Sequence, residues 1–400
     1  MARADSLIVA CLLTVMVALG PLSTDLYLPS LPAIGAEFGA GTATVQLTLS
    51  VFLAGFALSQ LIYGPLSDRF GRRPMILGGI VLYLLASLAC AYAPSIEVLI
   101  LARFGQALGA CVGPVLGRAA VRDIYGRERA AALLSYMGMV MALAPAFGPI
   151  LGGIVEVHFG WRANFVVLAA FALAMLLATL VILPETNQWK SRDATRPGHL
   201  VAAYLSLLRH RSYIGYVLVV ACAYSGIFSF ISGSSFVLIG LLGLSPDVYG
   251  FCFAAIVVGY MIGAFLSGRY TARVGLERMV QLGTAVQALG GCVGLAIYAT
   301  GIVTVAGIVG PVVVFMVGTG LAMPNAQAGA IGPFPRMAGS ASALLGFFQM
   351  GSAALVGIVV GHGSASSALA MMTAIALVGL GGVLSYWLIV HPAPVAAEAD

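Results

Sequence analysis

Twelve mostly apolar runs, each long enough to cross a bilayer as a helix, dominate this 400-residue chain. Hydrophobic residues make up 61% of it and charged residues 8%, whereas a soluble domain carries roughly a quarter charged residues. Because so few polar residues cannot cover a soluble core, the solvent must be lipid. The sequence therefore predicts an all-α membrane protein with twelve transmembrane helices. Their approximate ranges are 7–34, 44–63, 74–93, 96–117, 134–155, 164–183, 213–236, 248–267, 279–300, 303–324, 341–361 and 366–389.

The first run begins at Leu7, and no small-residue cleavage site ends it before the next polar stretch. We therefore interpret it as the first span rather than as a signal peptide. It is longer than one crossing needs, so we expect its end to tilt or unwind near Pro29 and Pro32.

Basic residues are concentrated in alternate loops. If the N-terminus is cytoplasmic, every even-numbered span ends on the cytoplasmic side, where Lys and Arg are expected in excess. The opposite loops hold only Arg162, so both termini are predicted to be cytoplasmic. The net charge of +5 then reflects topology and does not indicate nucleic-acid binding. The inner-loop residues are Arg69, Arg72, Arg73, Arg118, Arg122, Arg127, Arg129, Lys190, Arg192, Arg196, Arg209, Arg211, Arg269, Arg273, Arg278 and Arg336.

The longest polar segment follows six spans and precedes six, which is the position of a linker between two homologous halves. We therefore predict two pseudo-symmetric six-helix bundles, at 1–184 and 213–400, joined by a cytoplasmic linker at 185–212. A short internal echo supports this division. Leu66-Ser67-Asp68-Arg69 resembles Leu266-Ser267-Gly268-Arg269 at an offset of 200 residues, with Gly268 in the place of Asp68.

The loop between spans 2 and 3 carries a specific pattern, Gly64-Pro65-Leu66-Ser67-Asp68-Arg69-Phe70-Gly71-Arg72-Arg73-Pro74. Glycine permits close approach and unusual backbone angles at Gly64 and Gly71. An ordinary orienting loop would explain the arginines alone, but not this spacing. The pattern resembles the signature loop of the major facilitator superfamily. That resemblance implies a cytoplasmic gate, in which Asp68 faces a helix N-terminus near Ser340 and the end of span 4 contributes Arg122 and Asp123.

Span 5 contains Ala144-Pro145-Ala146-Phe147-Gly148-Pro149-Ile150-Leu151-Gly152-Gly153. Gly148 and Gly152 lie four residues apart and make a smooth face for helix packing, while Pro145 and Pro149 would kink the helix. Such packing motifs are common in membranes. The fuller pattern, with Gly153, resembles the antiporter motif of drug exporters in the same superfamily and therefore favours export over uptake.

Three further stretches narrow the resemblance to the bicyclomycin-resistance (Bcr/CflA) branch of the drug:proton antiporters. They are Ser23-Thr24-Asp25-Leu26-Tyr27-Leu28-Pro29, then Arg122-Asp123-Ile124-Tyr125, and Met323-Pro324-Asn325-Ala326 with Pro333-Phe334-Pro335 ahead of Ala343-Leu344-Leu345-Gly346. The resemblance implies a multi-pass protein of the bacterial inner membrane that is not an enzyme. It also implies a transporter with no cofactor, driven by the proton gradient.

Asp25 is the only acid well inside an apolar run, and Arg103 lies at a comparable depth, roughly 12–14 Å from the outer end of its helix. An intramembrane acid indicates function by default, although a permanently paired structural carboxylate is the alternative. Burial favours the neutral acid, and a nearby arginine favours the carboxylate. We therefore predict Asp25 as the proton carrier and Arg103 as its coupling partner, since Arg103-Phe104-Gly105-Gln106 resembles the family motif tied to proton coupling.

The expected function is proton-coupled efflux of small amphiphilic drugs or antibiotics by alternating access. The family often places a second acid in the middle of span 1, and Thr14-Val15-Met16-Val17-Ala18 has none, so neutral or zwitterionic substrates are expected. An exporter of one metabolite, such as a sugar or amino acid derivative, is the first alternative. A membrane enzyme is the alternative from another class, but it would need clustered catalytic groups at membrane depth.

Several polar and aromatic residues are candidates for the substrate cavity, although each one alone is as well explained by core or lipid-facing packing. No His or Cys pair has metal-ligand spacing, so no metal site is predicted. The expected partners are an amphiphilic small molecule, protons and the lipid bilayer, and we expect a monomer that binds no nucleic acid. The cavity candidates are Tyr27, Gln106, Tyr224, Phe228, Phe230, Tyr260, Phe347 and Gln349.

Overall fold

Helices are the only regular secondary structure in the residues that the computed structural model describes, which are 6–125, 127–187, 197–301, 303–334, 337–363 and 367–391. This agrees with the predicted all-α class. The inner-loop residues Lys190, Arg192, Arg196 and Arg336 lie outside these ranges, as does Pro335.

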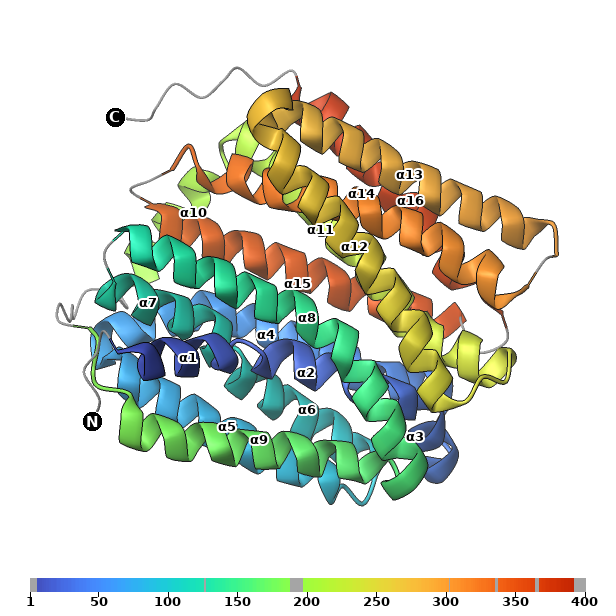
Figure 1. Ribbon diagram of the computed structural model, residues 1–400, viewed down its shortest axis with the longest axis horizontal. Helices are drawn as coiled ribbons and strands as arrows, with labels where there is room; N and C mark the ends of the chain where they lie inside the picture. The colour runs from blue at the N-terminus through green and yellow to red at the C-terminus, as the bar shows by residue number, and fades with distance from the viewer. Residues whose placement is uncertain are drawn as a thin grey trace. The chain divides into compact units, whose positions relative to one another are not determined.

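Each of the twelve predicted runs coincides with helical structure (Figure 1). Eleven of the resulting segments are long and apolar enough to cross a membrane, among the residues described. The fifth run lies in α8, where Leu143–Phe159 forms a shorter apolar stretch. The long helices are α4 (Thr42–Phe70), α5 (Arg72–Ala91), α6 (Ile96–Ala110), α8 (Arg127–Phe159), α9 (Trp161–Ile182), α11 (Arg211–Ser235), α12 (Pro246–Val274), α13 (Leu276–Ala299), α14 (Val305–Ile331), α15 (Ala338–Gly363) and α16 (Leu369–Ser385).

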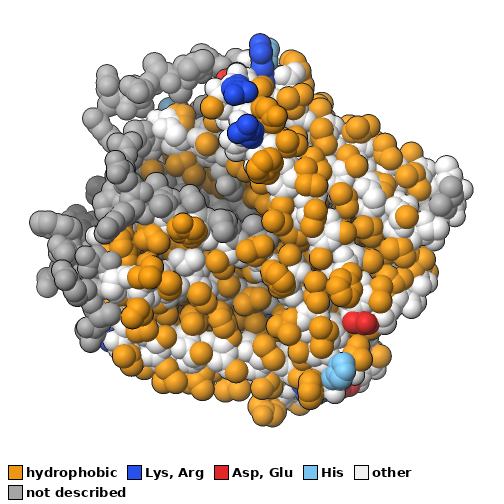
Figure 2. Space-filling model, viewed as in Figure 1, with side chains coloured by type: hydrophobic (Ala, Val, Ile, Leu, Met, Phe, Trp, Pro, Cys, Tyr) orange, Lys and Arg blue, Asp and Glu red, His pale blue; other side chains and the backbone are white. Residues whose placement is uncertain are grey.

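Three helices continue into π-helical turns. Helix α6 passes through Gly113–Gly117 into α7 (Arg118–Ile124), α11 ends in Phe236–Leu241, and α16 ends in Tyr386–Val390. Hydrophobic side chains are spread over much of the described surface drawn in Figure 2, and charged side chains are few there. A surface of this kind suits a lipid environment, because apolar side chains cost nothing when they face acyl chains.

The first span is interrupted twice. It consists of α1 (Leu7–Met16), α2 (Leu19–Asp25), a 3₁₀ turn at Leu28–Ser30 and α3 (Leu31–Phe38). Pro29 and Pro32 each sit at the second position of a helical segment, so the expected unwinding near them is confirmed. The additional break at Val17 precedes Pro21, which has no N–H to continue the helix. As a result, Asp25 is the last residue of a short helix.

Contacts divide the chain into two compact units. Unit 1 contains Met1–Ala40, Val51–Arg196 and Pro246–Gly250, and unit 2 contains Gly41–Ser50, Pro197–Ser245 and Phe251–Asp400. The predicted division at 1–184, 185–212 and 213–400 remains a prediction, as do the cytoplasmic termini. The described part of the predicted linker holds helix α10 (Pro197–Leu207) and the first residues of α11.

Within unit 1, α5 packs against α6 and α9, and α2 packs against α8 (Figure 1). Within unit 2, α13 packs against α14 and α16, and α11 packs against α14, α15 and α16. Close packing in unit 1 depends on glycine where α8 meets α2, and this contact positions the candidate site.

Candidate functional site

Asp25 is buried, with 2% of its surface exposed. Its Oδ1 accepts a hydrogen bond from Thr24 Oγ1 at 3.1 Å. No ion pair involving Asp25 is found among the described residues. Asp25 is the last residue of helix α2. The surroundings of Asp25 therefore suit a group that gains and loses a proton, more than a permanently charged carboxylate.

Helix α8 approaches Asp25 through the span 5 motif. A β-carbon added at Gly148 would lie 2.9 Å from the Asp25 β-carbon, and one added at Gly152 would collide with the Leu26 carbonyl oxygen. These two positions therefore require glycine. Helix α8 continues as one helix through Pro145 and Pro149.

Gly153, on the same motif, faces a different neighbour. A β-carbon there would collide with the carbonyl oxygen of Pro246, a residue of unit 1 by its contacts. The motif thus presents glycine in two directions, toward the Asp25 turn and toward the start of α12.

Arg103 is fully buried in unit 1. Its Nη1 donates to the Ser23 carbonyl oxygen at 2.9 Å and to Gln106 Oε1 at 2.5 Å. The guanidinium carbon lies 4.3 Å from the ring centroids of both Tyr27 and Phe52, a distance typical of cation–π contacts. Arg103 is therefore bound to the backbone of span 1 two residues before Asp25, and not to the Asp25 carboxylate. Their similar depth in the sequence leaves direct contact between Asp25 and Arg103 open; in the structure Arg103 reaches the first span through the Ser23 carbonyl oxygen.

A chain of hydroxyl and amide groups continues from Arg103. Gln106 Nε2 donates to Ser87 Oγ at 2.8 Å, and Ser87 Oγ donates to the Tyr83 carbonyl oxygen at 2.7 Å. The Tyr83 hydroxyl lies 2.6 Å from Ser23 Oγ, which itself bonds the Leu19 carbonyl oxygen at 2.5 Å. The network therefore returns to Ser23 and holds the turn that carries Asp25 against α5 and α6.

Four residues of this environment were not predicted: Ser23 as a partner, Tyr83, Ser87 and Phe52. Each stands in an apolar run, where a hydroxyl or aromatic residue usually bonds its own helix or packs in the core. Their spacing gives no signal, because they come from three different spans. The buried arginine is the one sequence feature that indicates such a network, since its guanidinium must find hydrogen-bond acceptors in neighbouring helices.

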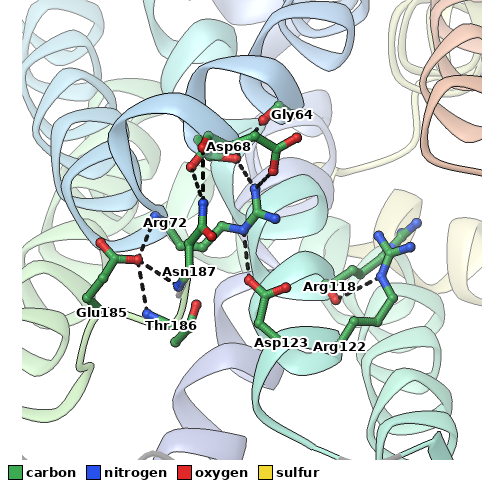
Figure 3. A network of polar contacts seen from close by, with 10 residues as sticks. Gly64, Asp68, Arg72, Arg118, Arg122, Asp123, Glu185, Thr186 and Asn187 are labelled. Atoms are coloured by element: carbon green, nitrogen blue, oxygen red, sulfur yellow. Dashed lines mark hydrogen bonds and ion pairs between the residues drawn. The ribbon is translucent and has the colours of Figure 1, made fainter. Parts of the chain in front are cut away.

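A second polar cluster of unit 1 lies where α4 ends and α5 begins, and it is centred on Arg72 (Figure 3). Arg72 Nη1 lies 2.5 Å from Asp68 Oδ1, and Arg72 Nε lies 2.9 Å from Asp123 Oδ2. The predicted association of Asp123 with this loop is therefore present within unit 1. The predicted contact of Asp68 with the helix start near Ser340 remains a prediction.

The segment after α9 also binds this loop (Figure 3). Glu185 Oε1 accepts hydrogen bonds from the backbone N–H groups of Arg72, Thr186 and Asn187, at 2.9, 3.0 and 2.9 Å. Asn187 Nδ2 donates to the Ser67 and Asp68 carbonyl oxygens, at 3.1 and 3.2 Å. The carboxylate of Glu185 thus meets the N-terminus of α5, where backbone N–H groups lack helical partners.

The remaining loop residues have separate roles. Gly71 has φ of 107° and precedes α5, a conformation that favours glycine. Gly64 has no positive φ, and a β-carbon there would meet no atom within 4 Å, so its local surroundings do not require glycine. Arg73 Nη2 donates to the Leu180 carbonyl oxygen at 2.9 Å, and the Arg69 guanidinium lies 5.2 Å from the Phe70 ring centroid. Arg122 Nε bonds the Arg118 carbonyl oxygen at 3.4 Å.

Near the second copy of the loop motif, in unit 2, neutral side chains connect two helices. Asn325 Nδ2 donates to Ser267 Oγ at 2.7 Å, and Thr271 Oγ1 donates to Asn325 Oδ1 at 3.1 Å. Ser267 corresponds to Ser67 in the sequence echo. An amide and two hydroxyl groups therefore join helices α12 and α14 of unit 2, whereas ion pairs join α5 to its neighbours in unit 1.

The cavity candidates are distributed over both units. Tyr27 and Gln106 both contact Arg103, which makes them part of the buried network. Phe228 and Phe230 are buried in α11 and stack near Tyr224 and Phe253, with ring centroids 4.9 and 5.9 Å apart. Their role in binding substrate remains a prediction. The other candidates are Tyr260, which is partly buried, Phe347, which packs on Phe348, and Gln349, which accepts a hydrogen bond from Gln327 at 3.5 Å.

Comparison with known sequences decides the family. The sequence profile described as Major Facilitator Superfamily matches residues 13–357. The chain belongs to this superfamily. The resemblance seen in its loop and span 5 motifs is thereby confirmed, and the chain is a transporter rather than an enzyme.

Three curated relatives of this superfamily member come from bacteria. The "Bicyclomycin resistance protein homolog" of Haemophilus influenzae is 30% identical over 378 residues, which cover 94% of this chain and 94% of that protein. The "Chloramphenicol resistance protein" of Pseudomonas aeruginosa is 33% identical, over 84% of this chain and 79% of that protein. "Multidrug resistance protein D" of Escherichia coli is 30% identical, over 87% of each chain. These relatives place the chain in the predicted drug:proton antiporter branch and indicate a multi-pass transporter of the bacterial inner membrane.

Solved structures agree on the fold of this superfamily member. The crystal structure of a D-xylose–proton symporter superimposes with a TM-score of 0.73 at 16% identity, over 97% of this chain and 98% of that one. At this identity the comparison supports the all-helical fold alone. Among the described residues, no group of three or more His, Cys, Asp or Glu side chains could hold a metal ion.

Proposed function

We propose that this transporter exports small, uncharged or zwitterionic amphiphilic compounds, including antibiotics, in exchange for protons, with Asp25 as the proton carrier. The observation that carries the proposal is that Asp25 is buried and has no ionic partner among the described residues. Arg103 is close in the chain of contacts, because it is bound to the Ser23 carbonyl oxygen two residues before Asp25. The names of the relatives, which include bicyclomycin, chloramphenicol and multidrug resistance proteins, support the substrate class.

The chemistry follows from the cost of burying charge. A carboxylate at membrane depth costs several kcal/mol on any scale, roughly 2.5–3.5 kcal/mol by insertion measurements, so a buried and unpaired acid favours its neutral form. Opening the site to water, or moving the Arg103 guanidinium closer, favours the charged form. A change in conformation then binds a proton on one side and releases it on the other, and no cofactor is needed.

The span 5 motif contributes to this proposal through packing. Gly148 and Gly152 hold α8 against the turn at Asp25 and Leu26, so movement of α8 cannot leave that turn unchanged. A substrate that displaces α8 would therefore alter the surroundings of the proton carrier. This arrangement supports exchange, in which proton and substrate bind alternately.

Reconstituted protein in lipid vesicles tests the proposal. With an imposed proton gradient, wild-type protein is expected to move radiolabelled chloramphenicol, which is uncharged, and to discriminate against ethidium, a permanent cation. Asp25→Asn should abolish gradient-driven movement while the protein remains folded. Glu37→Gln is the matched control, because Glu37 is an exposed acid paired with Arg162. Wild-type transport rates in Asp25→Asn vesicles would refute Asp25 as the carrier.

The same vesicles separate drug export from export of one metabolite. A panel of sugars and amino acid derivatives offered in competition with chloramphenicol would identify a metabolite exporter by strong inhibition from one compound. The proposal expects weak inhibition by all of them, with competition from other uncharged amphiphiles.

A further inference from the structure

Two glycines of α15 contact a glutamine from the start of α4. Gly357 and Gly361 lie four residues apart, on one face of α15. A β-carbon at Gly361 would lie 2.6 Å from Gln46 Cγ and 2.7 Å from Gln46 Cβ, so the stem of the glutamine packs directly on this glycine. A β-carbon at Gly357 would lie 3.8 Å from Gln46 Nε2. The amide end of Gln46 is therefore directed from Gly361 toward Gly357.

Two hydroxyl groups face the same glycine. The β-carbon that Gly357 lacks would lie 2.9 Å from Ser50 Oγ and 3.1 Å from Ser232 Oγ, which come from α4 and α11. Gln46 and Ser232 are fully buried, and Ser50 is 2% exposed. All four residues belong to unit 2 by their contacts. Two helices of unit 2 thus direct three polar side chains at one glycine of a third.

These polar atoms make no hydrogen bonds among the described residues. Both amide atoms of Gln46, Ser50 Oγ and Ser232 Oγ lack a partner there. A serine hydroxyl in an apolar helix usually bonds a carbonyl oxygen one turn earlier, as Ser229 Oγ bonds that of Ser225 at 2.8 Å. No such bond is found for Ser50 or Ser232 in the described part of the chain. Because a buried polar group without a partner is costly, the cluster needs a partner from outside the chain.

The chemistry of the cluster defines that partner. Glutamine and serine carry no charge, so the site offers an ion no opposite charge. Gln46 supplies N–H donors and a carbonyl acceptor, and the hydroxyl groups of Ser50 and Ser232 can each donate and accept. A hydroxyl group matches this set, because it also donates and accepts. Glycine at position 357 leaves the point that the three side chains face free of a side chain of its own.

A hydroxyl group can come from water or from a transported compound. Buried water commonly binds polar groups of this kind, typically through about three hydrogen bonds. The second source is suggested by α11, where Tyr224, Phe228 and Ser232 recur every fourth residue and lie along one side of the helix. The ring centroids of Tyr224 and Phe228 are 4.9 Å apart. An amphiphilic compound with its apolar body on these rings would direct a hydroxyl group toward Ser232.

We propose that Gln46, Ser50 and Ser232, around Gly357, form a binding site for a neutral hydroxyl group in unit 2. Occupation by water is independent of the proposed function. Occupation by a hydroxyl group of the transported compound deepens the proposed function and rests on it. The two proposals can fail separately, because hydration of this site is measured without transport and without Asp25.

Solid-state NMR on protein in lipid, with labelled glutamine side chains, tests the site through magnetisation transfer from water. The Gln46 amide should receive water magnetisation although it is fully buried, and Gln46→Met assigns its signal. Gln106 is the internal comparison, because it is also fully buried but its Nε2 donates to Ser87 Oγ. Transfer to Gln46 several-fold above that to Gln106 supports the site. A Gln46 amide that receives no more than Gln106, in protein without added compound, would overturn the inference.

Filling the site gives a second test. Gly357→Ala places a methyl group at the point that the two hydroxyl groups and the amide face, so transfer to the Gln46 amide should fall to the level of Gln106. Gly351→Ala, on the same helix, has open space and should leave the transfer as in wild type. Wild-type transfer to Gln46 in Gly357→Ala would contradict the site.

Chloramphenicol, which carries two hydroxyl groups, distinguishes the two sources. If one of its hydroxyl groups binds the site, a saturating concentration should lower the water transfer to Gln46 and leave that to Gln106 unchanged. Unchanged transfer to Gln46 would assign the site to water. Both results support the site, and neither depends on whether Asp25 carries protons.

Thermal unfolding of Gln46→Met is an independent measurement. The substitution removes both amide atoms and nearly keeps the length of the side chain. If the amide binds a hydroxyl group, its loss should lower the unfolding temperature, whereas removal of an amide without any partner would raise it. An unfolding temperature above that of wild type would therefore also overturn the inference.

Discussion

Gly148 of α8 packs directly on Asp25 of α2, so closely that a β-carbon on the glycine would lie 2.9 Å from the aspartate β-carbon. The two residues are far apart in the sequence and belong to different sequence motifs. Their contact means that the antiporter-type motif of span 5 helps to fix the position of the buried acid. Helix packing and the proposed proton carrier therefore share one contact surface in unit 1.

Substituting the span 5 glycines should disturb this contact to different degrees. Gly148→Ala meets a side-chain β-carbon and Gly152→Ala meets a backbone carbonyl oxygen, which cannot move away alone. Overpacking costs about 1–3 kcal/mol, so Gly152→Ala should lower the thermal unfolding temperature of the purified protein more than Gly148→Ala. Gly78→Ala, on α5, has open space and is the control. Equal unfolding temperatures for Gly152→Ala and Gly78→Ala would contradict this packing.

Replacing Arg103 tests the hydrogen bonds of its guanidinium. Arg103→Lys keeps the charge but loses the planar donor group that reaches both Ser23 and Gln106. We expect a loss of about 1–3 kcal/mol in stability, measured by thermal unfolding, together with a reduced rate of gradient-driven chloramphenicol transport. Arg162→Lys is the control, because its side chain is 40% exposed and surface ion pairs contribute little. A melting profile of Arg103→Lys that matches the control would argue against this network.

Tyr83→Phe removes one hydroxyl from the same network. The Tyr83 hydroxyl is 2.6 Å from Ser23 Oγ, and Ser23 keeps its bond to the Leu19 carbonyl oxygen in the variant. The expected cost is therefore modest, about 0.5–1.5 kcal/mol by thermal unfolding. Tyr92→Phe serves as the comparison, since Tyr92 is 77% exposed and should change nothing measurable. If both variants unfold at the wild-type temperature, the buried hydroxyl contributes nothing to stability.

Glu185→Gln tests the carboxylate that joins the segment after α9 to the start of α5. The wild-type Oε1 accepts three backbone N–H groups, and hydrogen bonds to a charged acceptor are worth roughly 1.5–3 kcal/mol, about twice the value of neutral ones. In the purified protein, a protease should therefore cut the segment that follows α9 faster in Glu185→Gln than in wild type. Glu277→Gln replaces an exposed acid in the first turn of α13 and should leave cleavage in this segment unchanged.

Much of this protein follows from its sequence. A segment that crosses lipid must be apolar, and its backbone groups must form hydrogen bonds within the segment itself. Both requirements concern one segment at a time. Each predicted run therefore coincides with helical structure. The same reasoning identified Asp25 and Arg103, because ionisable residues inside apolar runs are rare. Pro29 and Pro32 likewise indicated the interrupted first span, since proline restricts its own backbone wherever it stands.

Only the tertiary structure decided which of these groups meet. Asp25 and Arg103 lie at similar depths, but depth along a helix does not specify rotation, and Arg103 bonds the Ser23 carbonyl oxygen instead of the Asp25 carboxylate. Ser87, Tyr83, Ser50 and Gln46 gave no sequence signal, because a hydroxyl or amide in an apolar run can bond its own helix equally well. The glycines of span 5 indicated close packing but not its target. For Gly148 the target is Asp25, and this contact depends on how α8 and the first span rotate and cross, which no single segment determines.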